Sequence, residues 1–265
     1  MTDGLPDLLL DVAVDAARRA GALLLDGIGQ ARSIQTKSSA TDMVSDMDRA
    51  AETAIRAVIA GRRPGDAVLG EEGGASEGST GVRWIVDPLD GTTNFLYRFP
   101  AWAVSVAAEA EGAVVAGAVY DPTHDEIWTA TKGGGAACNG VPLDPVSEVP
   151  LADALVATGF SYLPERRRAQ GEVVARLLPL VRDIRRAGAA ALDLCWQAAG
   201  RVDAYYEMGT HVWDWAAGAL VAEESGSWVG DFEGGPPSER GLLAASPLLA
   251  DALRALVAPT RDART

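Results

Sequence analysis

The sequence is most informative at Trp84-Ile-Val-Asp-Pro-Leu-Asp-Gly-Thr-Thr-Asn-Phe95, where two carboxylates follow an apolar run and precede a glycine turn. The apolar run predicts a strand, and Asp87 and Asp90 come at its end. Carboxylates attract a divalent cation, and a glycine turn that opens a helix presents backbone N–H groups to an anion. These twelve residues therefore predict a place where a metal and a phosphate meet.

The composition is that of an ordinary globular protein, with 265 residues of which 48% are hydrophobic and 23% charged. This length allows one large domain or two smaller ones. The net charge of −14 disfavours binding to nucleic acid or to an anionic membrane surface, because the phosphates would be repelled. An acidic protein can still bind a phosphate ester if metal ions invert the local charge.

The cysteine usage and the N-terminus indicate where the protein resides. The two cysteines, Cys138 and Cys195, lie far apart and show no paired spacing. The chain begins with acidic rather than basic residues, and no apolar run approaches the roughly 20 residues that a membrane span requires. We therefore expect a cytoplasmic protein with reduced thiols and no membrane segment.

The pattern of predicted elements changes near residue 143. Before it, helical periodicity at 9–28 and 48–60 is followed by a series of strand-like runs between 67 and 131. After it, short strands and helices alternate, which is typical of α/β layering. The sequence thus predicts an N-terminal α+β half with an antiparallel sheet (1–143) and a C-terminal α/β half (144–265).

Two further acids carry signals at the ends of predicted elements. Glu71 ends a short strand, and Asp214 lies at the start of an apolar helix. If these acids converge with Asp87 and Asp90, two unit charges about 5 Å apart at an effective dielectric near 20 repel by about 3 kcal/mol. Such a cluster requires cations or protonation. Oxygen ligands favour Mg²⁺, Mn²⁺ or Ca²⁺ over zinc, and the chain has only two histidines.

Each of these acids, taken alone, also fits a structural role. Asp214 is typical of a helix N-cap. Asp90, which precedes a glycine, is typical of a turn. Glu71 fits a solvated loop. Only the combination of segments favours a metal site.

Several segments taken together resemble the inositol monophosphatase family. The resemblance rests on Asp87-Pro-Leu-Asp-Gly-Thr-Thr-Asn94, on Trp213-Asp-Trp-Ala-Ala-Gly218 and on Gly70-Glu-Glu-Gly73. A fourth segment is similar to the family pattern K-x₄-D-x-V-T-x₂-D, with Ser45 in place of threonine, and consists of Lys37, Asp42, Val44, Ser45 and Asp48. The resemblance covers about residues 8 to 230, and several motifs in order make it far more specific than a single glycine pattern.

The resemblance implies a layered αβαβα sandwich of the inositol monophosphatase and fructose-1,6-bisphosphatase type, with a mixed α+β and α/β character. It also implies a homodimer, inhibition by lithium and a requirement for two to three Mg²⁺ ions in each active site, with Mn²⁺ as a possible substitute. The number of metals at cellular Mg²⁺ and the oligomeric state do not follow from the sequence itself.

The resemblance further implies roles for named residues. The first metal would be held by Glu71, Asp87 and the Leu89 carbonyl, and the second by Asp87, Asp90 and Asp214. Thr92 and Glu71, supported by Asp48, would orient and deprotonate the attacking water. The backbone N–H groups of Gly91 and Thr92 would hold the phosphate.

The alcohol part of the substrate would lie against Asp90, Gly188, Ala189, Ala190 and Glu207. The Glu207 carboxylate can accept two hydroxyl hydrogen bonds, which suits a polyol. Ala189 replaces a serine or threonine often found there in the family, which removes one hydroxyl that could select the stereochemistry of the substrate.

The reaction that follows from these roles is hydrolysis of inositol-1-phosphate to inositol and phosphate by a metal-activated water. Alternatives on the same fold are phosphatases of histidinol phosphate, fructose-1,6-bisphosphate or 3′-phosphoadenosine-5′-phosphate. Thr93 stands where some of these relatives have lysine, which favours the inositol-type reaction. A non-catalytic regulatory protein is disfavoured, because all four metal carboxylates and Thr92 are present.

Overall fold

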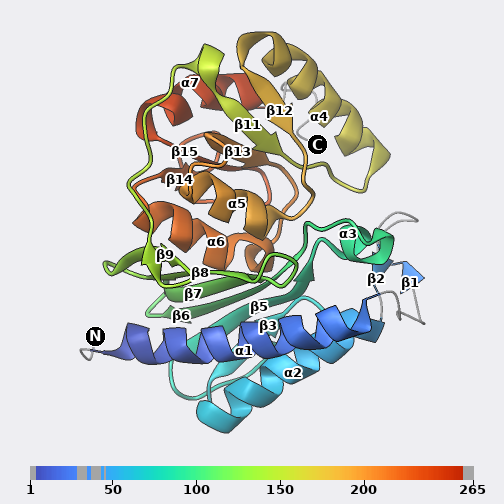
Figure 1. The fold of residues 1–265 in the computed structure, drawn as a ribbon, viewed down its shortest axis with the longest axis vertical. Coiled ribbons are helices and arrows are strands. Elements are labelled where there is room, and N and C mark those ends of the chain that lie inside the picture. Colours follow the sequence, from blue (N-terminus) through green and yellow to red (C-terminus); the bar gives the residue numbers. More distant parts are fainter. Residues whose placement is uncertain (1–3, 29–34, 37–42, 45, 259–265) are drawn as a thin grey trace.

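Two β-sheets alternate with three layers of helices, so that the order through the molecule is helices, sheet, helices, sheet, helices (Figure 1). The computed structural model describes residues 4–28, 35–36, 43–44 and 46–258. The helices are α1 (Leu5–Gly27), α2 (Asp46–Arg62), α3 (Thr92–Tyr97), α4 (Pro164–Leu177), α5 (Ala190–Ala198), α6 (Val212–Glu224) and α7 (Pro247–Val257). The layered sandwich predicted from the sequence is confirmed.

The larger sheet has eight strands in the order β10-β9-β8-β7-β6-β5-β3-β4. All neighbouring pairs are antiparallel except β3 and β5. Its strands are β3 (Ala67–Gly70), β4 (Gly74–Ser76), β5 (Val82–Asp90), β6 (Ala103–Ala110), β7 (Ala113–Asp121), β8 (Glu126–Thr131), β9 (Gly135–Cys138) and β10 (Val141–Pro142). The short strand β4 forms the edge of this sheet and pairs antiparallel with β3.

The smaller sheet has five strands in the order β12-β11-β13-β15-β14, with β11 parallel to both β12 and β13. Its strands are β11 (Leu155–Thr158), β12 (Asp183–Arg185), β13 (Ala204–Glu207), β14 (Trp228–Gly230) and β15 (Leu242–Ala245). The sequence did not predict β15, although its four residues are all buried. A two-stranded ribbon of β1 (Gln35–Thr36) and β2 (Met43–Val44) lies outside both sheets.

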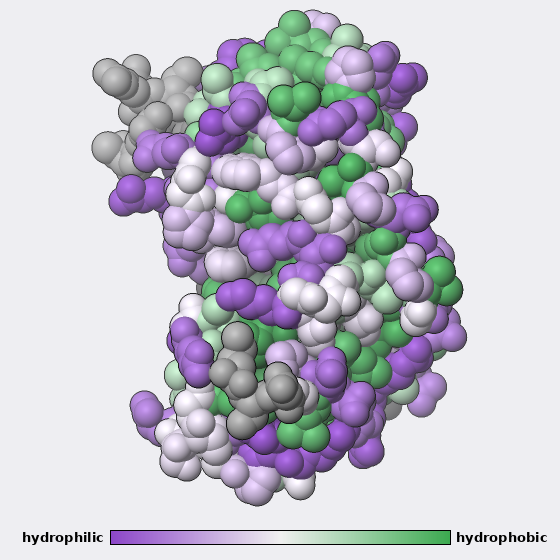
Figure 2. Space-filling model, turned by 90° about the vertical axis from the view of Figure 1, so that its left-hand side faces the viewer, coloured by the Kyte–Doolittle hydropathy of each residue, from purple (hydrophilic) through white to green (hydrophobic). Residues whose placement is uncertain are grey.

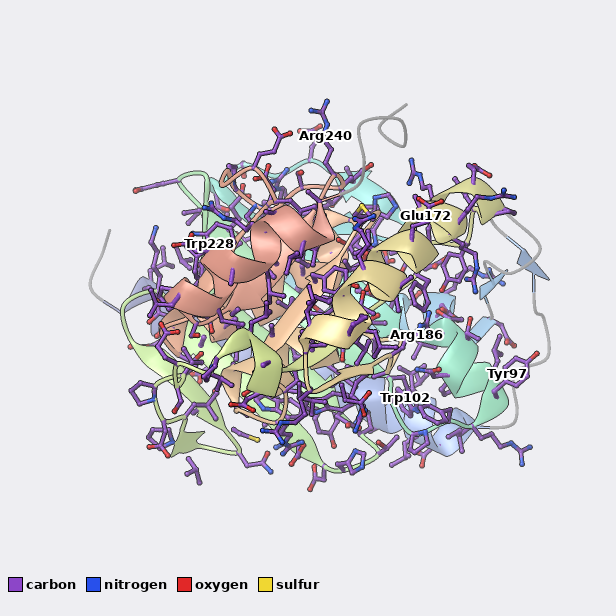
Figure 3. All side chains as sticks on the ribbon, turned by 90° about the horizontal axis from the view of Figure 1, so that it is seen from above. Tyr97, Trp102, Glu172, Arg186, Trp228 and Arg240 are labelled. Atoms are coloured by element: carbon purple, nitrogen blue, oxygen red, sulfur yellow. The ribbon has the colours of Figure 1, made fainter. Side chains whose placement is uncertain are left out.

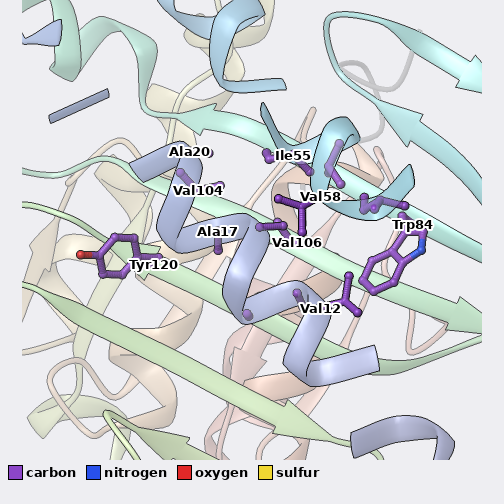
Figure 4. Close-up of a cluster of buried hydrophobic side chains, with 14 of the residues drawn as sticks. Val12, Ala17, Ala20, Ile55, Val58, Trp84, Val104, Val106 and Tyr120 are labelled. Atoms are coloured by element: carbon purple, nitrogen blue, oxygen red, sulfur yellow. The ribbon is translucent and has the colours of Figure 1, made fainter. Parts of the chain in front are cut away.

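The first helical layer packs α1 and α2 on the larger sheet (Figure 4). The buried face of α1 is rich in alanine, and Ala17 and Ala20 are fully buried beside Val104 and Val106 of β6. Small side chains allow the helix axis to approach the sheet closely, and each buried methyl group adds to the hydrophobic stabilisation. This layer fixes α2, whose other face points toward the end of β5.

Helices α5 and α6 lie between the two sheets, and α4 and α7 cover the outer face of the smaller sheet (Figure 1). Helices α5 and α6 pack within the core between both sheets. The predicted division of the chain into halves at residues 143 and 144 stays a prediction.

The surface shown in Figure 2 carries both hydrophilic and hydrophobic residues. Figure 2 shows one side of the molecule, where hydrophilic residues cover most of the face and hydrophobic residues gather mainly at its upper end. Leu248 at the start of α7 is 70% exposed, and Tyr97 of α3 is 77% exposed. None of the helices in the described ranges combines the length and the apolar character needed to cross a membrane. The predicted homodimer stays a prediction.

Candidate active site

A cavity of about 320 Å³ lies where the end of β5, the start of α3, the start of α6 and the end of β13 meet. Ten of the residues predicted for the site line it, namely Glu71, Asp87, Leu89, Asp90, Gly91, Thr92, Gly188, Ala190, Glu207 and Asp214. The fold thus brings together segments that are more than 140 residues apart in the chain. Ala189 and Asp48 do not line the cavity.

An irregularity in β5 turns two carboxylates toward the same cavity. Residues three apart in a regular strand point to opposite faces of the sheet. Between Asp87, which pairs with Ser105, and Asp90, which pairs with Ala103, the register with β6 shifts by one residue. Such a bulge re-aims side chains. Asp87 and Asp90 are consequently both buried and both line the cavity.

Each of the three aspartates uses one oxygen to accept a backbone hydrogen bond. Asp87 accepts from the N–H of Leu89 at 2.9 Å, and Asp90 accepts from the N–H of Ala191 at 2.7 Å. Asp214 accepts from the N–H of His211 at 2.7 Å. These bonds fix the three side chains while leaving the second oxygen of each for another partner.

The role of Asp214 differs from the N-cap that its sequence position alone suggests. The N-cap of α6 is His211, and Asp214 is the N3 residue of a capping box with it. The helix start therefore holds the carboxylate at the cavity wall through one oxygen only.

The acids raise one another's pKa values. Burial raises the pKa of Asp87 well above its usual range, and the nearby Glu71, Asp90 and Asp214 add to the effect. The pKa of Asp214 is raised in the same way, by burial first and then by Asp90 and Glu71. Burial also raises the pKa of Asp90 to about 7, although the Ala191 N–H opposes it. The site is therefore a destabilised cluster of negative charge that a cation or protons would relieve.

The start of α3 is held to α2 by a single hydroxyl. The Thr92 Oγ1 lies 2.9 Å from Asp48 Oδ1 and 3.1 Å from the Leu89 carbonyl oxygen, so that it donates to one of these two acceptors. Asp48 is 1% exposed. Gly91, the residue before Thr92, has a φ of +89°, and a Cβ on Gly91 would lie 2.9 Å from the Ala101 carbonyl oxygen. Only glycine fits this turn without strain.

Glu207, Gly188 and Ala190 also line the cavity. The Tyr205 hydroxyl donates to Glu207 Oε2 at 2.8 Å and orients that carboxylate. Burial raises the pKa of Glu207 to about 7, against the lowering effect of the Tyr205 hydrogen bond and of Arg186. Ala189 is 1% exposed, and its methyl group packs toward Gly91. The side chain of Ala189 therefore does not face a substrate in the cavity.

Sequence reasoning missed two arginines of the cavity wall, Arg166 at the start of α4 and Arg186 after β12. Neither has a hydrogen-bond or ion-pair partner among the described residues. Figure 3 shows Arg186 on the side of the molecule that carries α3 with Tyr97. Their sequence signal is weak, because they stand in runs of arginines of which other members face solvent.

The donor set fits a hard divalent cation. Three aspartates, Glu71 and the Leu89 carbonyl supply oxygen alone, which suits Mg²⁺, Mn²⁺ or Ca²⁺. In the described part of the chain, no three His, Cys, Asp or Glu side chains are already gathered around one ion position. Of the fourth motif, Lys37, Asp42 and Ser45 lie outside the described residues.

Comparison with known proteins agrees with this geometry. The model of the inositol monophosphatase family matches residues 6–264. The inositol-1-monophosphatase of Mycobacterium leprae is 47% identical over 233 residues, which cover 84% of this chain and 80% of the relative. A protein named Nus factor SuhB, from Pasteurella multocida, is 41% identical over 230 residues, which cover 86% of each chain.

A solved structure shows the same arrangement of layers. The crystal structure of the extragenic suppressor protein suhB from Bartonella henselae has a TM-score of 0.89 at 38% sequence identity. The match covers 93% of this chain and 97% of the other. This chain belongs to the inositol monophosphatase family, a family of phosphatases.

Proposed function

We propose that this phosphatase hydrolyses inositol-1-phosphate to inositol and phosphate, with Mg²⁺ as its cofactor. The observation that carries the proposal is that Glu71, Asp87, Asp90 and Asp214 line the same cavity as Glu207. A phosphate needs the cation that the four acids attract, and a polyol needs the hydroxyl acceptor that Glu207 supplies.

In this proposal Glu71, Asp87 and the Leu89 carbonyl hold one cation, and Asp87, Asp90 and Asp214 hold another, with a third held more loosely through Glu71. When bound, the cations supply Lewis-acid stabilisation of the phosphate and leaving-group oxygens, and they lower the pKa of a bound water. Mn²⁺ would satisfy the same oxygen donors.

The protein's own residues would then position the reactants. Thr92 holds its hydroxyl between Asp48 and Leu89, so that its oxygen can accept a hydrogen bond from the attacking water in a fixed direction. The Glu71 carboxylate accepts the proton of that water, because a threonine hydroxyl is not a base at neutral pH. The N–H groups of Gly91 and Thr92 bind the phosphate oxygens.

The alcohol side would be held by hydrogen bonds. Glu207 accepts from hydroxyl groups of the inositol ring while Tyr205 fixes one of its oxygens. Gly188 has no side chain and Ala190 has only a methyl group, and both line the cavity together with Asp90.

The test is phosphate release from inositol-1-phosphate at fixed enzyme concentration, in millimolar MgCl₂ and in EDTA. We expect release in MgCl₂ only, and inhibition by millimolar Li⁺. Absence of metal-dependent release from inositol-1-phosphate, histidinol phosphate, fructose-1,6-bisphosphate and 3′-phosphoadenosine-5′-phosphate alike would overturn the proposal. It would instead favour the non-catalytic regulatory protein considered as an alternative above.

One observation favours a second candidate, a substrate that carries two phosphates. Arg166 and Arg186 add positive charge to the cavity wall, and neither is neutralised by an ion pair in the described ranges. Arginine binds phosphate with a planar, bidentate fork. Fructose-1,6-bisphosphate and 3′-phosphoadenosine-5′-phosphate would present a second phosphate to them.

The two candidates separate in a comparison of variants. With a bisphosphate substrate, Arg186→Ala should raise KM for the bisphosphate at least about tenfold, since a charged hydrogen bond contributes about 1.5–3 kcal/mol. KM for inositol-1-phosphate should change little. Arg168→Ala is the matched control, because Arg168 is exposed on α4 and does not line the cavity. Equal effects on both substrates would exclude a second-phosphate site.

A further inference from the structure

Helix α2 turns a row of polar side chains toward the site. Asp48, Glu52 and Arg56 follow one another at intervals of four residues and therefore share one face of the helix. The apolar residues Ala51 and Ile55 occupy the face that packs against the sheet. Asp48 contacts Thr92, as described above, whereas Glu52 and Arg56 contact a different segment.

That segment is the turn between β3 and β4, which begins with Glu71. The Glu52 carboxylate accepts the N–H of Glu72 at 2.8 Å and the N–H of Gly73 at 3.0 and 3.1 Å. Arg56 donates to Glu52 Oε1 at 2.6 Å and to the Gly74 carbonyl at 2.6 Å. Glu52 is 2% exposed, so its hydrogen bonds with the turn are partly shielded from water.

The glycines of the turn are explained by the same contact. A Cβ on Gly70 would overlap the Glu52 carboxylate, and one on Gly73 would lie 2.5 Å from Glu52 Oε1. The backbone at both positions approaches the carboxylate more closely than any other residue would allow. Thus the segment Gly70-Glu-Glu-Gly73 fits around Glu52 as a unit.

We propose that Glu52 is a positioning residue, which fixes the turn at Glu71–Gly73 so that the Glu71 carboxylate faces the cavity before any cation binds. Together with Asp48, it makes α2 the common support of Thr92 and Glu71. The part that concerns the cation rests on the proposed function, whereas the part that concerns the turn does not.

The chemistry of the contact supports this role. Hydrogen bonds within an ion pair are shorter and stronger than neutral ones, and Glu52 forms such a pair with Arg56 at 2.6 Å. A turn fixed in advance does not have to be ordered when the ligand binds, so affinity for the ligand increases. Partners that orient metal ligands typically change metal affinity by about 10- to 100-fold when they are removed.

The decisive variant is Glu52→Gln, which keeps the size of the side chain but has one acceptor oxygen and an amide that faces the two N–H donors. We expect faster hydrogen exchange at the amides of residues 72 and 73 in the metal-free protein. We also expect at least about tenfold weaker Mg²⁺ binding by calorimetry. KM for inositol-1-phosphate should stay within about twofold.

Asp251→Asn is the control, because Asp251 and Arg254 form an ion pair three residues apart on α7, at 2.9 Å and away from both α2 and the cavity. This control should leave both the exchange of residues 72 and 73 and the Mg²⁺ affinity unchanged. If Glu52→Gln does not fold, Arg56→Ala provides a milder change, for which we expect faster exchange at residue 74 and a smaller loss of Mg²⁺ affinity.

Unchanged exchange at residues 72 and 73 in folded Glu52→Gln would overturn the positioning of the turn. Faster exchange with unchanged Mg²⁺ affinity would overturn its link to the cation, and would leave Glu52 with a purely structural role. Neither readout requires turnover, so a failure of the proposed phosphatase reaction is recognised separately, by the absence of phosphate release from the wild-type enzyme.

Discussion

The layer between α1, α2 and the larger sheet and the cavity at the end of β5 both consist of buried side chains, but their burial has opposite consequences. In the layer, residues such as Leu9, Val106 and Trp84 remove apolar surface from water. In the cavity, Asp87 and Asp90 are equally buried but repel each other. The first region is complete in the protein alone, whereas the second is stable only with protons or a cation.

Helix α2 therefore connects a region that stabilises the fold with a region that destabilises it. One face of the helix belongs to the apolar layer, and the other face holds Asp48 and Glu52 at the cavity. Strain and unfavourable charge concentrate at functional sites and persist because the surrounding structure is stable. Substitutions in the two regions should therefore move stability and activity independently.

The largest effect is expected from Asp90→Asn. The amide oxygen can still accept the Ala191 N–H, but the charge is lost. Metal ions stabilise a phosphoryl-transfer transition state by several kcal/mol, and about 1.4 kcal/mol corresponds to a factor of ten, so kcat should fall by about three orders of magnitude. The metal-free protein should melt at the same temperature or higher, because one repelling charge is removed. Steady-state kinetics and a thermal melt in EDTA check both parts, and a large loss of apo stability would mark Asp90 as structural.

The converse effect is expected from Leu9→Ala in the apolar layer. Leu9 is fully buried, so its truncation should cost about 2–5 kcal/mol of unfolding free energy. Well below the melting temperature, kcat and KM should stay within about twofold, because α1 does not line the cavity. Denaturant unfolding and kinetics on the same preparation test this. A loss of kcat without a loss of stability would contradict the separation of the two regions.

A smaller effect is expected from pH, through Glu207. Its folded-state pKa is raised to about 7 from an ordinary value of 4.5, so the folded protein binds more protons between these two values. The stability contributed by this group is therefore full below about pH 4.5 and is lost as the pH rises through about 7. Thermal melts in EDTA between pH 5 and 8 should show a smaller decrease for Glu207→Gln than for the wild type. Parallel curves of melting temperature against pH for the two proteins would show that the pKa of Glu207 is not raised by folding.

The smallest effect is expected from Ala189→Ser, which restores the hydroxyl that relatives often have. Ala189 is 1% exposed and packs toward Gly91 rather than into the cavity. We expect kcat/KM for inositol-1-phosphate to change by less than about threefold, which corresponds to about 0.6 kcal/mol. Assays with the D and L enantiomers of the substrate would reveal a role in stereochemical selection, and a large gain in selectivity would contradict the packing seen at this position.

The layered fold was predicted from the resemblance to the family, whereas periodicity predicted individual elements and the α/β alternation of the C-terminal half. The apolar helix predicted to start near Asp214 is α6 (Val212–Glu224). Periodicity missed β4 and β15, since a three-residue edge strand and a four-residue buried strand are too short to show a period. The helix α3 begins after Gly91, where the sequence predicted a glycine turn that opens a helix.

For the site, the sequence supplied the carboxylates but not the contacts that aim them. The bulge between Asp87 and Asp90 depends on pairing with β6, which local spacing does not reveal. Glu52 looked like a helix residue, and its contact with the turn after β3 joins positions 20 residues apart. Arg166 and Arg186 reach the cavity only through the packing of the smaller sheet. Such tertiary contacts cannot be predicted from the sequence of a single chain.

The central claim is that the acidic cavity is completed by a divalent cation. The most direct measurement is the melting temperature of the metal-free protein as MgCl₂ is added, compared with NaCl of equal ionic strength and with Asp90→Asn. A ligand that binds only the folded state stabilises it by about 2.7 kcal/mol at 100 times its Kd. We predict that the melting temperature of the wild type rises to a plateau as MgCl₂ is added, and that the rise for Asp90→Asn is much smaller. NaCl should change the melting temperature only by the general effect of ionic strength. Equal melting temperatures for the wild type in MgCl₂ and NaCl would contradict the claim.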